Sequence, residues 1–178
     1  MKTYFISDDS YFLIGLETSL CGLHCDKAFI NTNRFTTFHP DKNDLLIVSI
    51  QDHIKRRNYL SNQKAHGPRV IIIADFLVCH DTQEKYPRIV SKKITKEDLI
   101  EVLQNVKESD VIKRYASKIE YQIIYMICKG KGMREIAMKY NLSLKYLYGL
   151  KRKILKEHGL DNCNVNGLLI CRDILSGH

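Results

Sequence analysis

The sequence lacks the features that would place the protein in a membrane or in an oxidising compartment. No apolar run approaches the ~20 residues that a membrane-spanning helix needs. No signal peptide is recognisable, and none of the six cysteines forms a CxxC pair. We therefore expect a cytoplasmic protein with reduced thiols and no membrane partner.

Patterns for catalysis and metal binding are also missing. Cys21, His24 and Cys25 are closely spaced, but no second ligand pair follows at a suitable distance, so no metal site is predicted. No set of nucleophile, base and orienting group is readable, and Cys79 and His80 are adjacent without any sign of convergence. We expect neither an enzyme nor a bound cofactor, and no small-molecule ligand is evident.

What the sequence does have is an uneven distribution of charge. The chain of 178 residues has a net charge of +8. Between Lys113 and His158 there are 12 basic and 3 acidic residues, whereas the rest of the chain has 16 basic and 17 acidic residues. This asymmetry is typical of a nucleic-acid-binding module joined to a neutral domain.

The first two thirds of the chain predict an α/β domain. Continuous β-branched runs at Thr3–Ile6, Leu45–Ile50 and Val70–Ala74 are typical of strands buried on both faces, and weaker candidates lie near Ala28 and Arg88. These runs predict a doubly wound, parallel, five-stranded sheet with intervening helices.

Two of those helices have readable starts. Ser10 can cap a helix that runs to Leu20, and Thr95 can cap a later one. The segment from Phe76 to Lys85 is irregular, so a loop or a degenerate helix is expected there.

The last third predicts four helices. The first begins at Ser117 and ends in the glycines of "KGKG"; its apolar positions are Ile119, Ile123, Ile124 and Ile127. A short helix follows from about Met133, and Asn141 and Leu142 form a tight turn. Ser143 caps a basic helix that runs to His158, and a final helix covers about Asn164 to Leu175. Two helices joined by such a turn match a helix-turn-helix.

Helix 143–158 is amphipathic. Its apolar side carries Leu144, Leu147, Leu150, Ile154 and Leu155. Its opposite side carries Lys145, Tyr148, Gly149, Arg152 and Lys156. Lys151 falls on the apolar side and has to extend its amine outward. Gly149 costs about 1 kcal/mol in a helix interior; it either lets the backbone approach a duplex or makes room for a neighbouring helix.

A basic amphipathic helix can also lie on a membrane or simply face solvent. The membrane interpretation is disfavoured because the adjacent predicted helices need the same apolar stripe for their own core. A solvated helix and a segment that binds DNA remain, and the local excess of positive charge favours DNA.

The run from Ser117 to about Leu175 resembles the C-terminal domain of LuxR/FixJ (NarL) transcription factors. The similarity rests on "GKGMREIAMKYNLS" and "HGL", with anchors at Gly130, Glu135, Ile136, Ala137, Ser143 and Gly159. It implies base contacts from Tyr148, Gly149 and Arg152. Lys145, Lys151 and Lys156 are candidates for phosphate contacts. The family's usual lysine is replaced by Tyr148, which implies a different preferred sequence.

The first domain is similar to a response-regulator receiver through "ISDDS", "DLLIVSI" and "RIVSKK". The resemblance puts Asp8 and Asp9 at the Mg²⁺-binding positions and Lys92 at the lysine position. Ser49 stands where the phosphorylated aspartate is expected, and Ala74 stands at the switch Thr/Ser position. A serine hydroxyl is a poor nucleophile for this transfer, so a pseudo-receiver that is not phosphorylated is expected. The aspartates are then expected to cap the first helix, with Lys92 as a loop lysine or a partner of Asp8.

Together these features predict a pseudo-receiver at 1–108, a linker at 109–116 and a LuxR-type DNA-binding domain at 117–178. The layout resembles atypical enterobacterial regulators of acid resistance and fimbriae. It implies a sequence-specific transcription regulator, independent of phosphorylation, whose partner is double-stranded DNA. Dimerisation is expected through the apolar face of the last helix, which carries Val165, Leu168, Leu169 and Ile174. The alternative is an adaptor that forms a heterodimer with a true response regulator and modulates its promoter binding.

Overall fold

The computed structural model describes residues 1–23, 25–34, 38–61, 67–79, 85–108, 112–113, 117–160 and 165–175. The N-terminal part contains β1 (Thr3–Ser7), α1 (Ser10–Ser19), β2 (Lys27–Asn31), β3 (Leu45–Ser49), α2 (His53–Ser61), β4 (Arg69–Ala74), β5 (Lys85–Tyr86), β6 (Arg88–Ser91) and α3 (Lys96–Glu108). β7 (Ile112–Lys113), α4 (Lys118–Cys128), α5 (Met133–Tyr140), α6 (Leu144–Glu157) and α7 (Val165–Leu175) follow.

Five strands form one parallel sheet in the order β2-β1-β3-β4-β6. This is the flavodoxin-like order of doubly wound folds, so the predicted α/β architecture is confirmed. β3 is buried along its whole length and β4 from Val70 onward, which explains their continuous β-branched runs. A separate pair of short strands, β5 and β7, is also parallel.

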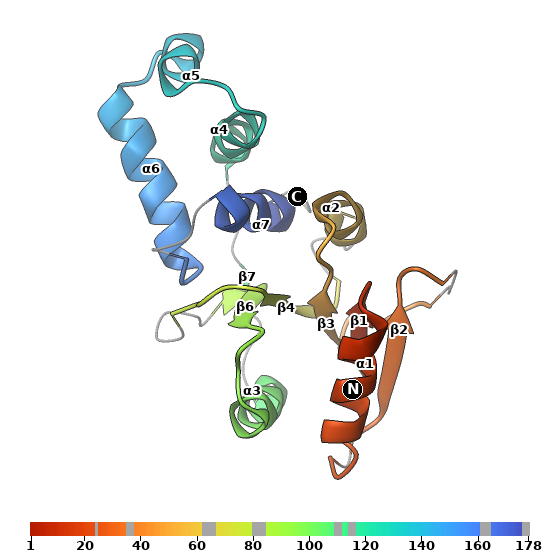
Figure 1. Ribbon diagram of the computed structural model, residues 1–178. Coiled ribbons are helices and arrows are strands. Elements are labelled where there is room, and N and C mark those ends of the chain that lie inside the picture. Colours follow the sequence, from red (N-terminus) through yellow and green to blue (C-terminus); the bar gives the residue numbers. More distant parts are fainter. Residues whose placement is uncertain are drawn as a thin grey trace.

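One face of the sheet is covered by α1 and α3 (Figure 1). Leu13 of α1 and Leu99 and Leu103 of α3 are buried in the same cluster as Phe5 and Ile47 of the sheet. Both helices begin at caps. The backbone N–H of Asp98 donates to Thr95 Oγ1 over 3.1 Å, as predicted. At α1 the prediction was wrong by one residue: Asp9 is the N-cap and Ser10 is the first helical residue.

The opposite face is covered in a different way. Of the connecting segments, only α2 supplies a helix there, because residues 32–34, 38–44 and 75–79 contain none. α7, from the end of the chain, packs beside α2 on this face (Figure 1). Ile6, Val48 and Ile72 of the sheet therefore share one buried cluster with Ile170 and Ile174 of α7.

The C-terminal part consists of the four predicted helices. Ser117 caps α4 in a capping box with Glu120: Ser117 Oγ accepts from the Glu120 N–H, and the Glu120 carboxylate accepts from the Ser117 N–H. Gly130, at φ 78°, follows the end of α4 as the "KGKG" motif predicts. Among the described residues, no helix is both long enough and apolar enough to cross a bilayer.

Three details of the predicted helical unit were wrong. Ile119 was expected inside but is 54% exposed in the first turn of α4. Leu144, in the first turn of α6, is 38% exposed. In α7, Leu168 and Ile174 are buried inside this chain and are not available for the expected dimer face, whereas Val165 is 65% exposed and Leu169 is half-buried.

Candidate nucleic-acid interface

The turn between α5 and α6 is built from three residues with specific backbone roles. Asn141 adopts the left-handed conformation at φ 50°, ψ 49°, which asparagine tolerates better than most residues. The Leu142 N–H donates to the carbonyl of Ala137 over 2.9 Å and closes the end of α5. Ser143 then caps α6, because its Oγ accepts from the Tyr146 N–H over 3.1 Å.

The inner faces of the two helices hold this unit together. Ile136 of α5 and Leu147, Leu150 and Ile154 of α6 are buried in one cluster. Tyr140 of α5 is half-buried against this cluster, and its hydroxyl donates to Gln122 Oε1 over 3.2 Å. The arrangement is a helix-turn-helix whose second helix presents its other side to solvent.

That outer side carries the residues that the sequence singled out. Lys145, Tyr148, Gly149, Arg152 and Lys156 are all exposed, and Tyr148 has 57% of its surface accessible. Lys151 is half-buried, in agreement with its expected position at the edge of the apolar side. These exposures show that no other described part of the chain covers this side of α6. Contacts of these residues with DNA stay a prediction.

Gly149 faces open space. A Cβ placed on it would meet no heavy atom within 4 Å, its own helix backbone and chain neighbours aside. The interpretation that this glycine makes room for a neighbouring helix is therefore wrong within this chain. The alternative, close approach of the backbone to a ligand, is compatible with the geometry.

The receiver-like residues gather at the carboxyl ends of β1, β3 and β4. Asp8 accepts from the backbone N–H groups of Gln51 and Asp52 at 3.1–3.2 Å. Asp9 caps α1: its carboxylate accepts from the Phe12 N–H over 3.1 Å, which is the main reason why the pKa of Asp9 is lowered. Lys92 lies 3.5 Å from Asp9 and lowers this pKa further. Lys92 therefore lies in the turn after β6, as expected for a loop lysine, and pairs with Asp9. The alternative expectation, a pair with Asp8, is wrong.

Ser49 and Ala74 are both buried at the ends of their strands. The carbonyl of Ser49 accepts a hydrogen bond from Ser7 Oγ over 2.7 Å, which ties β3 to β1. Asp52 directly precedes α2, and its carboxylate accepts from the N–H groups of Ile54 and Lys55 in the first turn of that helix.

A pocket of about 260 Å³ lies between these strand ends and α7. Ser49, Ala74 and Lys92 line it on the sheet side, whereas Asn166 and Leu169 line it from α7. α7 therefore lies over the strand ends that carry Ser49 and Ala74.

The structure reveals a buried charged cluster that the sequence analysis did not identify. Asp173 of α7 is fully buried, and its carboxylate accepts from Arg56 Nε of α2 over 2.9 Å and from the Arg172 guanidinium. Arg56 also donates to the carbonyl of Ile50 over 3.1 Å. The feature of the sequence that could have indicated this cluster is the Arg-Asp pair inside the otherwise apolar run "VNGLLICRDIL".

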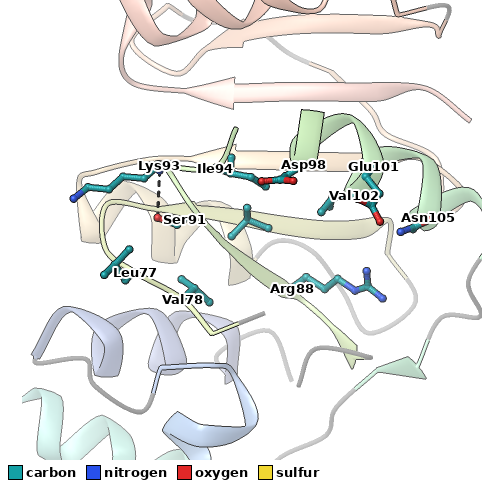
Figure 2. Close-up of a pocket in the computed structure, with 11 residues that line it drawn as sticks. Leu77, Val78, Arg88, Ser91, Lys93, Ile94, Asp98, Glu101, Val102 and Asn105 are labelled. Carbon is teal, nitrogen blue, oxygen red and sulfur yellow. Dashed lines mark hydrogen bonds between the residues drawn. The ribbon is translucent and has the colours of Figure 1, made fainter. Parts of the chain in front are cut away.

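A larger pocket, of about 660 Å³, opens at the edge strand β6 (Figure 2). Leu77 and Val78 of the segment after β4 line one side, and Asp98 and Glu101 of α3 line the other. The lining mixes apolar and oppositely charged side chains, which does not point to one ligand class.

No group of three or more metal-ligating side chains is found in the part of the chain that the structure describes. His24 and His80 lie outside the described residues, so the pairs that contain them are not placed.

Comparisons with known proteins give similarity to solved structures only. No family model and no curated protein matches the chain. The response regulator RcsB in complex with DNA is 16% identical, with 98% of each chain covered and a TM-score of 0.49. RcsB from Salmonella enterica serovar Typhimurium bound to promoter rprA is 16% identical, with 98% of each chain covered and a TM-score of 0.47. The response regulator ChrA of a heme-sensing two-component system is 17% identical, with 96% of this chain and 94% of that chain covered and a TM-score of 0.43. Likeness at this level does not establish a family, so function is inferred from this chain's own residues.

Proposed function

We propose that the protein is a sequence-specific DNA-binding transcription regulator that reads the major groove with α6. The observation that carries this proposal is the helix-turn-helix at Asn141–Ser143 followed by a helix whose solvent-facing side is basic. Lys145, Arg152 and Lys156 stay exposed on that side, while the opposite side is buried in the core. In helix-turn-helix proteins, the second helix enters the major groove and its residues contact base edges.

The side chains on α6 have different proposed roles. The Arg152 guanidinium matches the O6 and N7 acceptors of guanine, which makes it the main candidate for base reading. Tyr148 can contact a base edge or a thymine methyl group, and Gly149 permits close approach of the backbone. Lys145, Lys151 and Lys156 are assigned to phosphates, where they add affinity that depends on salt but not on sequence.

We further propose that this activity is independent of phosphorylation. Ser49 is buried and its position offers no carboxylate nucleophile, while Asp8 and Asp9 are engaged with backbone N–H groups and Lys92. Ala74 has no hydroxyl that could hold a phosphoryl group at the end of β4. Incubation with acetyl phosphate and Mg²⁺ should leave the intact mass and the DNA affinity unchanged.

The test of groove reading begins with a duplex selected from a random pool by the full-length protein. Arg152→Ala should weaken binding to the selected duplex by about 1–3 kcal/mol, because a bidentate contact with guanine is lost. Lys156→Ala should weaken binding to selected and random duplexes alike and reduce the salt slope by about one. Lys42→Ala, at an exposed lysine between β2 and β3, serves as the control for lost charge.

Two outcomes would contradict this assignment. If Arg152→Ala discriminates selected from random DNA as well as the parent chain does, Arg152 does not read bases. If the parent chain binds DNA only when a second regulator is present, the adaptor function is correct instead. Sedimentation of the DNA complex also counts the copies bound, and two are expected on a two-fold site.

A further inference from the structure

A concave surface between α2, α4 and α5 combines tyrosine rings with cations. This pocket has a volume of about 370 Å³, within the ~300–1,000 Å³ typical of ligand sites. Its main lining residues are Arg57 of α2, Tyr121, Gln122 and Tyr125 of α4, and Lys139 and Tyr140 of α5. None of these residues belongs to the outer face of α6.

The cations lie close to the rings. The Arg57 guanidinium carbon is 5.3 Å from the Tyr125 ring centroid, and Lys139 Nζ is 5.6 Å from that of Tyr140. Lys129 Nζ adds a third cation, 5.5 Å from the Tyr125 ring. Cation–π contacts hold each charge in place without neutralising it.

Within the described part of the chain, no acidic residue offsets these charges at the pocket. Among the described residues, no carboxylate lines it, and neither Arg57 nor Lys139 forms an ion pair. Tyr121 and Tyr125 are half-buried with ring centroids 6.0 Å apart. The surface therefore places two mutually tilted tyrosine rings, with an interplanar angle of 37°, next to positive charge that no described carboxylate offsets.

We propose that this pocket binds a nucleoside phosphate, with the base stacked on Tyr121 and the phosphate held between Arg57 and Lys139. Every base has a π-face that stacks on an aromatic side chain, and a phosphate satisfies both cations. Because Arg57 belongs to α2 and the other residues to the helix-turn-helix unit, the ligand bridges the two parts of the chain. The proposal is independent of groove reading by α6.

Calorimetric titration of the full-length protein tests the site with four probes: a purine nucleoside monophosphate, the same nucleoside without phosphate, inorganic phosphate, and a short single-stranded oligonucleotide. The monophosphate should bind at least tenfold more tightly than the nucleoside or phosphate alone. Tighter binding of the oligonucleotide than of the monophosphate would identify a nucleic-acid strand as the source of the nucleotide; the reverse order would identify a free nucleotide.

Matched variants locate the binding. Tyr121→Leu and Arg57→Gln should each lower the affinity about tenfold, the loss expected for one stacking or phosphate contact. Tyr121→Phe should retain it. Tyr11→Leu replaces a tyrosine that is 88% exposed on α1 and should change nothing. Duplex binding through α6 should survive Tyr121→Leu, which separates this site from the proposed function and shows that the variant is folded.

The proposal is overturned if neither nucleotide probe binds at millimolar concentration. It is equally overturned if inorganic phosphate binds as well as the monophosphate, or if Tyr121→Leu and Arg57→Gln leave nucleotide binding unchanged.

Discussion

Gly149 lowers the stability of α6, but it is the residue that the proposed close approach of the backbone to DNA requires. Glycine is unfavourable in a helix interior because it loses more backbone entropy on folding than alanine. Gly149 lies in the middle of α6 with open space around its Cα. Nothing within the folded chain explains why glycine is present at this position.

Gly149→Ala should raise the free energy of unfolding by about 0.5–1 kcal/mol, since alanine favours the helix and its methyl group meets no neighbour. The same methyl group should weaken binding to a selected duplex. Denaturant unfolding and DNA titration measure the two effects. Gly15→Ala is the matched control, because Gly15 is also helical, in α1, with open space around it. Equal DNA affinity of Gly149→Ala and the parent chain would refute the role of this glycine.

The reactivity of Cys128 depends on how closely α7 packs on α4. Burial raises the pKa of Cys128 to about 11, and its thiol donates to the carbonyl of Leu168 in α7 over 3.5 Å. Only the thiolate reacts quickly, so Cys128 should resist alkylation at pH 8. The exposed Cys21 and Cys79 are the internal comparison. Mass spectrometry after iodoacetamide treatment gives the order of labelling, and early labelling of Cys128 would mean that α7 does not stay packed on α4.

At the scale of elements, the helical unit depends on its caps. α6 begins at Ser143, whose hydroxyl satisfies a backbone N–H that has no partner inside the helix. Ser143→Ala should lower the free energy of unfolding by about 1 kcal/mol, whereas Ser143→Asp should retain most of it because aspartate also caps. Chemical denaturation followed by circular dichroism measures both. Equal stability of the alanine variant and the parent chain would show that the cap is dispensable.

The helices on the two faces of the sheet differ in origin, and this difference determines where α7 packs. A doubly wound sheet needs helices on both faces, yet α2 is the only connecting helix in the described residues on the α7 side. The apolar surface of the sheet that α2 does not cover is buried by α7. Leu168 and Ile174, two of the four residues expected at the dimer face, are thereby buried within one chain.

For the whole molecule, the buried Arg56–Asp173–Arg172 cluster joins the two parts. Asp173→Asn leaves two buried guanidinium groups without a counter-charge and should lower the free energy of unfolding by about 3–5 kcal/mol. Asp26→Asn is the control: Asp26 pairs with Lys2 at 3.7 Å on the surface, where loss of the pair should cost less than about 1 kcal/mol.

The unfolding curve itself tests the arrangement. Because the sheet and α7 share one buried cluster, the parent chain should unfold in a single transition. Two separate transitions, or similar costs for Asp173→Asn and Asp26→Asn, would contradict a joined core. The predicted boundary at 109–116 remains a prediction; β7 lies inside that segment and pairs with β5.

The sequence by itself determined the elements and most of their ends. Strands appear as β-branched runs because they are buried on both sides, and helices begin at Ser117, Ser143 and Thr95 because a cap is a local hydrogen bond. The exposed basic side of α6 follows from helical periodicity alone. Its contacts with bases and phosphates are still predictions, since a pattern shows which side is free and not what binds there.

Only the tertiary structure decided what covers each apolar face. The period of α7 shows that it has such a face but cannot distinguish a second copy from a sheet in the same chain. The partner of Asp173 is Arg56, 117 residues away, and no local pattern encodes that distance. The physical reason is that burial is non-directional: apolar surface packs against whichever complementary surface the fold brings near. Among the described connecting residues only α2 forms a helix on this face of the sheet, and α7 packs on the remaining apolar surface.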